Sequence, residues 1–124
     1  MLVIGQSPGK GRGIFALSTI DKGVCIEQAP VIVIPEDEII HIRRTVFYNY
    51  FFKWGETLKD AAIALGYGSL FNHSYQPNAM FKLRLDQLYI DFITLKPIQP
   101  GEEITVNYNG DPADQSRLWF KTVE

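Results

Sequence analysis

Glycine and proline interrupt this chain so often that only short elements fit between them. Ten glycines and seven prolines are spread over 124 residues. Short apolar runs rich in β-branched residues are typical of strands, whereas a helix needs a longer periodic pattern. The clearest run spans 80–85 and 88–95, where apolar residues alternate with polar ones around Asp86-Gln87 and predict a β-hairpin. We therefore predict a mostly β protein with few, short helices.

Other segments extend this prediction along the chain. Further strands are expected at 2–4, 14–16, 24–28, 31–34, 61–65 and 103–108, and a loop at 7–13. Pro35 followed by acidic residues predicts a helix that ends near Arg44, because acidic side chains favour the positive end of the helix dipole. A second helix is expected over 113–120, with Asp111 as its N-cap.

Composition excludes several classes of protein. The net charge of −2 speaks against binding nucleic acid through phosphate contacts. The single cysteine, Cys25, excludes a disulfide framework or a multi-cysteine zinc site, so no metal is expected. No apolar run approaches the roughly 20 residues of a membrane span, and the start lacks a signal-peptide pattern. We expect a cytoplasmic location, with the nucleus, or a host nucleus for a viral or delivered protein, as the alternative.

Three segments carry polar residues in patterns that an ordinary core does not need. The glycines at 9–13 let a ligand approach the backbone closely, although a flexible hairpin loop explains them equally well. Residues 68–78 place asparagine, histidine and serine beside apolar residues, which predicts either a buried polar network or a ligand site. Residues 101–108 lead from a turn glycine and two acids into a strand that ends at a tyrosine.

Taken in this order, the segments resemble the signature motifs of the SET-domain protein-lysine methyltransferases. The stretch 9–16 is similar to the opening glycine motif, 71–78 to the Asn-His-Ser…Pro-Asn motif, and 101–108 to the Gly-Glu-Glu…Tyr motif. The resemblance is nearest to short SET proteins of viruses and bacteria. It implies a β-clip-like SET fold of small sheets with a C-terminal pseudoknot, in which 72–74 passes beside the last motif. It also implies one SET domain over 1–124, with a core at 3–108 and a lid at 109–124.

The family activity implied is methyl transfer from S-adenosylmethionine to the side-chain amine of a lysine in a protein, with a histone among the substrates expected. The resemblance makes Tyr108 the catalytic residue. It assigns Tyr50, with Tyr48 as the competitor, and Val106 to the lysine channel. The residues that it assigns to cofactor binding are Lys10, Gly11, Arg12, Gly13, Asn72, His73, Tyr108 and Trp119.

Some features leave alternatives open. Tyr75 stands where relatives often have cysteine, and the cysteine-rich zinc tail of many relatives is absent. Trp119 and Phe120 are therefore the aromatic candidates for a lid, although Trp119 could equally pack on the core. A SET-fold module that binds a cofactor or peptide without turnover is the alternative function. The aromatic-rich stretch 47–54 adds a homodimer to the expected partners.

Overall fold

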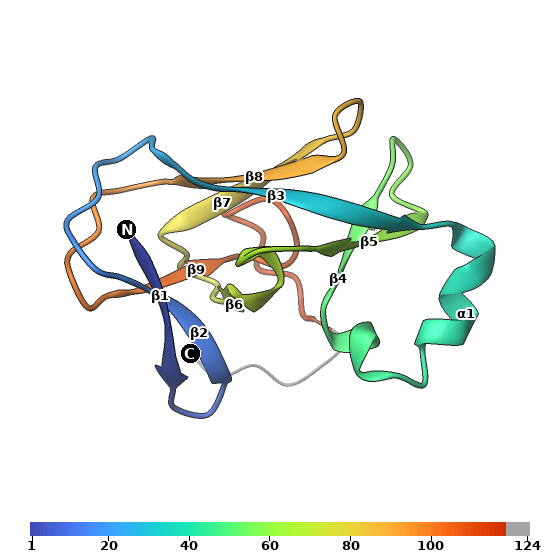
Figure 1. Ribbon diagram of the computed structural model, residues 1–124, viewed down its shortest axis with the longest axis horizontal. Coiled ribbons are helices and arrows are strands. Elements are labelled where there is room, and N and C mark those ends of the chain that lie inside the picture. Colours follow the sequence, from blue (N-terminus) through green and yellow to red (C-terminus); the bar gives the residue numbers. More distant parts are fainter. Residues whose placement is uncertain (119–124) are drawn as a thin grey trace.

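The computed structural model describes residues 1–118, whose strands form two sheets (Figure 1). One sheet has the strand order β1-β2-β9-β6 and the other β4-β5-β3-β8-β7. The strands are β1 (Leu2–Ser7), β2 (Gly11–Ala16), β3 (Cys25–Ile34), β4 (Phe51–Trp54), β5 (Asp60–Ala64), β6 (Asn72–His73), β7 (Ala79–Arg84), β8 (Tyr89–Thr94) and β9 (Glu103–Val106). The helices are η1 (Glu36–Glu38), α1 (Ile39–Ile42), η2 (Val46–Asn49) and η3 (Gly68–Leu70). The prediction of a mostly β fold is confirmed.

Strand β3 joins the two halves of the five-stranded sheet. Residues from Cys25 to Pro30 pair with β8, and residues from Val31 to Ile34 pair with β5. The prediction of two separate strands was therefore wrong. Pro30 lies where the pairing partner changes, and its carbonyl accepts a hydrogen bond from the Leu65 N–H at 2.9 Å. The strand continues through the proline because the position that lacks an N–H coincides with this change of partner.

The hairpins β4–β5 and β7–β8 complete the five-stranded sheet. The predicted hairpin is confirmed as β7–β8, and Leu88 closes its turn with a φ of 61°. The strand expected at 61–65 is confirmed as β5, whose buried alanines leave room for η3. A methyl group on Gly68 of η3 would lie within 2.8 Å of the methyl groups of both Ala64 and Ala29. This close approach brings η3 against the sheet and so sets the position of β6, which follows it.

The loop expected at 7–13 is shorter than predicted, because Ser7 and residues 11–13 belong to strands and only residues 8–10 form the turn. Strand β2 begins at Gly11 and pairs with β1 along its full length. The turn is short and is closed by a 2.9 Å hydrogen bond from the Lys10 N–H to the Ser7 carbonyl. Gly11 has a φ of 78°, a backbone conformation that favours glycine. The glycines thus serve a tight hairpin, and the flanking apolar residues carry the strand pairing.

Helical structure is confined to short pieces. The helix expected after Pro35 is present, but it is split into η1 and α1, and α1 ends at Ile42 instead of near Arg44. No helix occurs over 113–118, so the expected C-terminal helix is wrong for that part, and 119–120 lie outside the described residues.

Side chains compete with helix formation in this C-terminal segment. Asn107 donates to the carbonyl of Asp114 at 2.6 Å, and Asn109 donates to the carbonyl of Ser116 at 2.8 Å. The Asp111 carboxylate accepts a hydrogen bond from the Ala113 N–H at 2.9 Å, which forms an Asx turn instead of a helix cap. The carbonyls that a helix would use are therefore bound by asparagines.

One hydrophobic core connects the two sheets. Its fully buried large residues are Ile14, Phe71, Ile90, Phe92, Ile98, Ile104 and Val106, which come from both sheets and from the segments between them. Phe71, directly before β6, stacks on Phe92 of β8 with ring centroids 4.5 Å apart. This contact fixes the start of β6 against the five-stranded sheet.

Candidate active site

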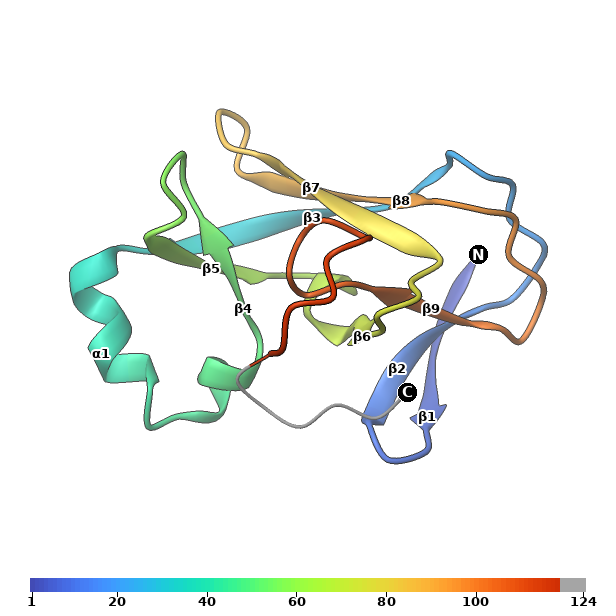
Figure 2. The ribbon, with the colours of Figure 1, turned by 180° about the vertical axis from the view of Figure 1, so that it is seen from behind.

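Two segments that are distant in sequence run side by side within the smaller sheet. Strand β6 pairs in parallel with β9, as Asn72 with Thr105 and His73 with Val106. Strand β9 also pairs with β2, and both views show β2, β9 and β6 close together (Figures 1 and 2). The expected passage of 72–74 beside the last motif is confirmed. We call the region formed by residues 11–13, 72–78 and 102–108 the motif crossing.

The side chain of Asn72 has a fixed orientation in the motif crossing. Its Nδ2 donates to the Arg12 carbonyl at 3.1 Å and to the Glu103 carboxylate at 2.8 Å. Both partners are acceptors only, so the amide nitrogen must face them and Oδ1 must face away. The second carboxylate oxygen of Glu103 accepts from the Ser7 hydroxyl at 2.7 Å. Asn72 therefore presents an acceptor oxygen from a carboxamide that is held in place.

Gly13 lies against this pair with no space for a side chain. A methyl group there would approach the Asn72 amide nitrogen to 2.7 Å and the Glu103 carboxylate even more closely. The pairing of β2 with β9 stops at Ile14, so within residues 1–118 the same edge of β2 at 11–13 has no strand partner. Backbone groups along that edge lie beside a carboxylate and a carboxamide, which is an arrangement able to bind a small zwitterion.

Asn78 closes the other side of the motif crossing. The residue is 5% exposed, and its Oδ1 accepts from the Thr105 N–H at 2.9 Å. Its Nδ2 donates to the Glu103 carbonyl at 2.8 Å and to the Glu102 carboxylate at 3.1 Å. The side chain thus replaces a missing strand partner for β9. Asn72, His73 and Asn78 bind the backbone and the two glutamates, as a buried polar network requires.

His73 holds the end of β9 in place. Its Nδ1 accepts a 2.9 Å hydrogen bond from the Tyr108 N–H, so this nitrogen carries no proton. The two rings lie 5.2 Å apart between centroids, and His73 also makes an edge contact with Tyr75 at 4.4 Å. The side chain of His73 therefore sets where Tyr108 leaves the strand.

The hydroxyl of Tyr108 donates to the Phe71 carbonyl at 2.7 Å. Burial raises the pKa of this phenol well above its usual value, and the neighbouring Tyr50 and Glu103 raise the pKa further. Tyr108 is thus a neutral phenol at physiological pH. Because its proton is directed at a carbonyl, the hydroxyl oxygen interacts with further groups as an acceptor.

The structure brings only some of the predicted residues to Tyr108. Tyr50 is 40% exposed and close enough to affect the ionisation of Tyr108, whereas the ring of Tyr48 packs on Phe51 with centroids 5.4 Å apart. Val106 is fully buried in the core. These placements favour Tyr50 over its competitor as the aromatic residue beside Tyr108.

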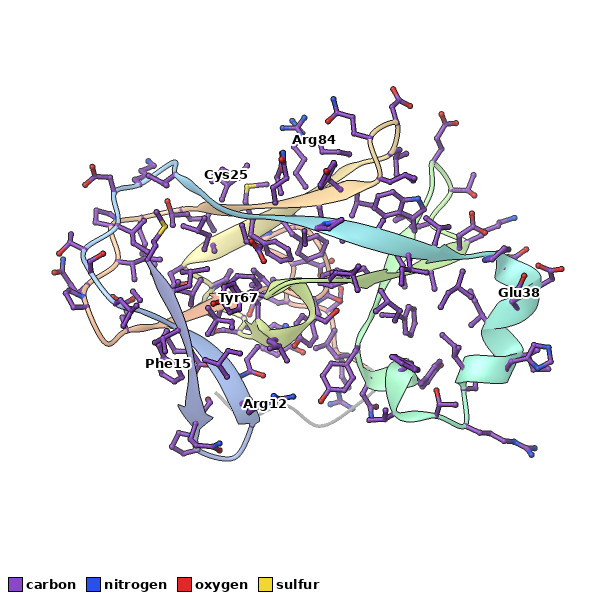
Figure 3. All side chains as sticks on the ribbon, viewed as in Figure 1. Arg12, Phe15, Cys25, Glu38, Tyr67 and Arg84 are labelled. Atoms are coloured by element: carbon purple, nitrogen blue, oxygen red, sulfur yellow. The ribbon has the colours of Figure 1, made fainter. Side chains whose placement is uncertain are left out.

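The remaining predicted residues surround the same region. Lys10 reaches across from the β1–β2 turn, and its Nζ lies 3.4 Å from the His73 carbonyl. Arg12 is exposed on β2, where Figure 3 shows its side chain near the molecular edge. Trp119 lies outside the described residues.

Sequence reasoning missed the supporting residues. Ser7 and Glu103 hold Asn72, and the Ser69 hydroxyl donates to the Ala64 carbonyl at 2.7 Å while it lies 3.5 Å from the Tyr50 carbonyl. Glu103 belongs to a recognised motif, so its position was a signal. Ser7 and Ser69 gave no sequence signal, because single serines are common in such short elements.

Comparison with known proteins identifies the fold family. The SET-domain family model matches residues 11–109. The chain is 38% identical over 121 residues to a Schizosaccharomyces pombe histone-lysine N-methyltransferase, H3 lysine-37 specific, covering 97% of this chain and 77% of that protein. It is 37% identical over 109 residues to the Drosophila melanogaster histone-lysine N-methyltransferase Set2, covering 80% of this chain but 5% of that one.

Solved structures show the same arrangement. A proposed histone methyltransferase from Plasmodium falciparum superposes with a TM-score of 0.69 at 30% identity, covering 87% of this chain and 96% of that one. The structure of ctPRC2 bound to S-adenosylmethionine superposes with a TM-score of 0.72 at 27% identity, covering 86% of this chain and 15% of that one. The chain therefore belongs to the SET-domain family, whose members are protein-lysine methyltransferases, and it shares that enzymatic class.

No helix in residues 1–118 is long and apolar enough to cross a membrane. In the same residues, no group of three or more histidine, cysteine, aspartate or glutamate side chains is arranged to hold a metal ion.

Proposed function

We propose that this chain transfers the methyl group of S-adenosylmethionine to a lysine amine of a histone. The observation that carries the proposal is the motif crossing, where Gly13, Asn72 and Tyr108 come from three distant segments and converge beside one open strand edge. The named activity of the fission-yeast relative, on histone H3 lysine 37, supports a histone as the substrate. S-Adenosylmethionine, present in a solved structural relative, supplies the methyl group on a sulfonium ion.

The residues around Gly13 suit the amino-acid end of this cofactor. The edge of β2 at 11–13 has no strand partner within residues 1–118, and Asn72, which binds the Arg12 carbonyl on that edge, adds an acceptor oxygen that suits an ammonium group. The Glu103 carboxylate adds negative charge beside it, and the one salt bridge within residues 1–118 joins Arg84 and Asp91 elsewhere. Negative charge near a cationic ligand is favourable in a partly buried site. We assign Lys10 and the backbone of His73 to the rest of the cofactor.

Tyr108 is proposed to hold the lysine amine as an acceptor. A free lysine has a pKa of about 10.4, so its deprotonation at pH 7 costs about 4–5 kcal/mol. Desolvation in a channel and a nearby cation both lower that cost. A neutral phenol oxygen whose own proton is bound by the Phe71 carbonyl orients the amine without competing for its lone pair. Its raised pKa excludes the phenolate of Tyr108 as the base at physiological pH.

We place the lysine channel between Tyr108 and Tyr50, with Val106 behind it in the core. Tyr50 follows η2 and is partly open to solvent, so its ring is accessible to an incoming side chain. Aromatic faces attract a cation through the ring quadrupole. Orientation of the reacting groups supplies up to roughly 7–11 kcal/mol in well-positioned reactions.

The test replaces Tyr108 and separates binding from turnover. Tyr108→Phe should abolish methyl transfer to histone H3 while the calorimetric affinity for S-adenosylmethionine stays within about fivefold, since the loss of one hydrogen bond costs about 1 kcal/mol. Tyr89→Phe, in β8 on the far side of the core, should retain full activity. Full activity of Tyr108→Phe would refute the assigned role.

A second measurement addresses the substrate and the alternative of a binding module. Wild-type protein with labelled cofactor should label histone H3 more strongly than the variant of H3 in which lysine 37 is arginine. Equal labelling of both would show that this chain does not share the lysine-37 specificity named for the fission-yeast relative. Tight binding of the cofactor with no labelling of any lysine-bearing protein would favour the module without turnover.

A further inference from the structure

The segment from 36 to 49 stands apart from the rest of the fold. It contains η1, α1 and η2, and none of these three elements has a buried residue. Figure 1 shows α1 at one end of the molecule, beyond the edge of the sheets. Its first residue is tied to β5 by a 2.9 Å hydrogen bond from the Glu36 N–H to the Asp60 carboxylate. We call residues 36–49 the helical segment.

The helical segment exposes large apolar side chains. Ile40 is 62% exposed, Val46 63% and Phe47 51%. Ile39 and Ile42 are partly buried, so they form the inner side and Ile40 lies on the outer side. Contiguous apolar side chains on a surface of this kind mark an interaction site more often than isolated ones do.

Charges are distributed along the outer side in a self-complementary order. Three exposed acidic residues, Glu36, Asp37 and Glu38, precede Ile40, and two exposed basic residues, Arg43 and Arg44, follow it. Figure 3 shows Glu38 at the outer rim of this end of the molecule. None of the five forms a salt bridge within residues 1–118. Their charges are therefore available to a partner.

The spacing of these charges fits a second copy of the same chain. The acidic residues lie in η1, directly before α1, and Arg43 and Arg44 directly follow α1, so the opposite charges stand at the two ends of this short helix. Ile40 lies between them. In a two-fold interface residue i meets residue j and residue j meets residue i. An antiparallel pair of segments therefore brings each acidic end to a basic end, with the two Ile40 side chains near the axis.

We propose that the helical segment is a homodimer interface, in which two copies pair antiparallel about a two-fold axis near Ile40. Asp37 of one copy then faces Arg44 of the other, while Val46 and Phe47 extend the apolar contact. Stable interfaces bury about 1,200–2,000 Å² in total, so the aromatic and aliphatic side chains must contribute as well as the charges. Surface ion pairs alone give only about 0.2–1 kcal/mol each, and they supply the orientation.

The test uses two charge-reversed variants of the full chain. One carries Arg43→Glu with Arg44→Glu, and the other carries Glu36→Lys with Asp37→Lys. Each variant alone should dimerise about 10- to 100-fold more weakly than wild type, because like charges then meet at both ends. An equimolar mixture of the two should recover dimers, and so should a chain that carries all four changes.

Light scattering coupled to size-exclusion chromatography distinguishes the outcomes. Wild type should show twice the 14.1 kDa mass of one chain, and each variant alone should approach 14.1 kDa. Far-UV circular dichroism checks that the variants fold. Monomeric wild type, a dimer insensitive to either variant, or a mixture that stays monomeric would each overturn the proposal. None of these results depends on methyl transfer.

A matched pair of apolar substitutions tests the position of the axis. Ile40→Glu places two carboxylates opposite each other and should dissociate the dimer, with loss at least as large as in the charge-reversed variants. Leu17→Glu is the control, since Leu17 is 60% exposed but directly follows β2, outside the helical segment. Equal effects of the two substitutions would show that the interface lies elsewhere.

Discussion

The motif crossing and the helical segment differ in burial and in where their side chains find hydrogen-bond or charge partners. In the motif crossing, Asn78 is 5% exposed, and its side chain bonds only to β9 and to Glu102 directly before it. In the helical segment no residue is buried, and the side chains that could bind a neighbour point outward. The polar side chains of the motif crossing bind other residues of the chain, whereas the helical segment exposes charged and apolar side chains to a partner.

This difference teaches where each region can tolerate change. A carboxamide held between two acceptors loses its orientation when a neighbour is altered, because a buried polar group left without a partner is costly. A solvent-exposed side chain loses little when it is truncated. Substitutions in the motif crossing should therefore affect stability and the proposed cofactor binding together, whereas those in the helical segment should affect association alone.

The largest expected effect comes from Gly13→Ala. The added methyl group would meet the Asn72 amide and the Glu103 carboxylate, so both must move. We expect the affinity for S-adenosylmethionine, measured by calorimetry, to fall at least about tenfold and the free energy of unfolding by about 1–3 kcal/mol.

Gly23→Ala is the control for this experiment. Gly23 has a φ of 81°, but a methyl group there would meet nothing within 4 Å. It should cost about 1–2 kcal/mol of stability from the left-handed backbone while cofactor affinity remains unchanged. Equal cofactor affinity of the two variants would show that the Asn72–Glu103 pair does not shape the cofactor site.

Substitution of one asparagine in each region should change the free energy of unfolding by different amounts. Asn78→Ala leaves the Thr105 N–H without its acceptor, so urea denaturation should show a loss of about 2–3 kcal/mol. Asn49→Ala, exposed at the end of η2, should change the free energy of unfolding by less than about 0.5 kcal/mol. Similar losses in the two variants would contradict the division between the regions.

The strands and motifs were predictable because their signals are local. Alternation around Asp86-Gln87 identified the β7–β8 hairpin, and the resemblance carried by the motifs implied that 72–74 would pass beside the last motif. The loop expected at 7–13 was predicted too long because glycine composition is a local signal, whereas the strand pairing of 11–13 with β1 is not. Pro30 misled for the same reason, since the change of pairing partner there depends on two distant strands.

The site was predictable in its motif residues but not in their support. Asn72 and Tyr108 stand in recognisable patterns, yet the bonds from Ser7 to Glu103 and from Tyr108 to the Phe71 carbonyl join residues far apart in sequence. The C-terminal helix failed because Asn107 and Asn109 bind the carbonyls that it would need. Such competition by side chains is visible only once the chain has folded back on itself.

Asp91 lies outside both regions, and its substitution measures how much a buried, hydrogen-bonded carboxylate stabilises this fold. Asp91 in β8 is 6% exposed and accepts from Arg84 at 2.7 Å and from Gln28 at 3.0 Å. The hydrogen bond from Arg84 is the main cause of the lowered pKa of Asp91, with Gln28 adding to it against desolvation. Asp91→Asn should lose about 1–2 kcal/mol of stability at pH 7.

The sign of the pH dependence follows from the lowered pKa. The ionised form is stabilised in the folded protein, so the advantage of wild type over Asp91→Asn is present above about pH 4 and fades as the pH falls through the folded-state pKa. Asp86→Asn, at the exposed hairpin turn, should change stability at pH 7 by less than about 0.5 kcal/mol. An advantage that persists undiminished at pH 2 would rule out the charged contact as its source.

The smallest expected effect concerns Tyr108 under alkaline conditions, and it tests how completely the motif crossing is closed to water. Burial, followed by Tyr50 and Glu103, raises the pKa of this phenol in the folded protein, while the unfolded chain ionises near pH 10. The unfolded state therefore releases its proton first, and wild type should lose stability relative to Tyr108→Phe as the pH rises above about 10, by less than about 1 kcal/mol at pH 10.5. Urea denaturation of both proteins between pH 8 and pH 10.5, with about 0.5-unit steps, measures the difference and cancels the other tyrosines. If the difference in unfolding free energy between the two proteins stayed constant across this range, water would reach the Tyr108 hydroxyl. The motif crossing would then be exposed to solvent, as the helical segment is.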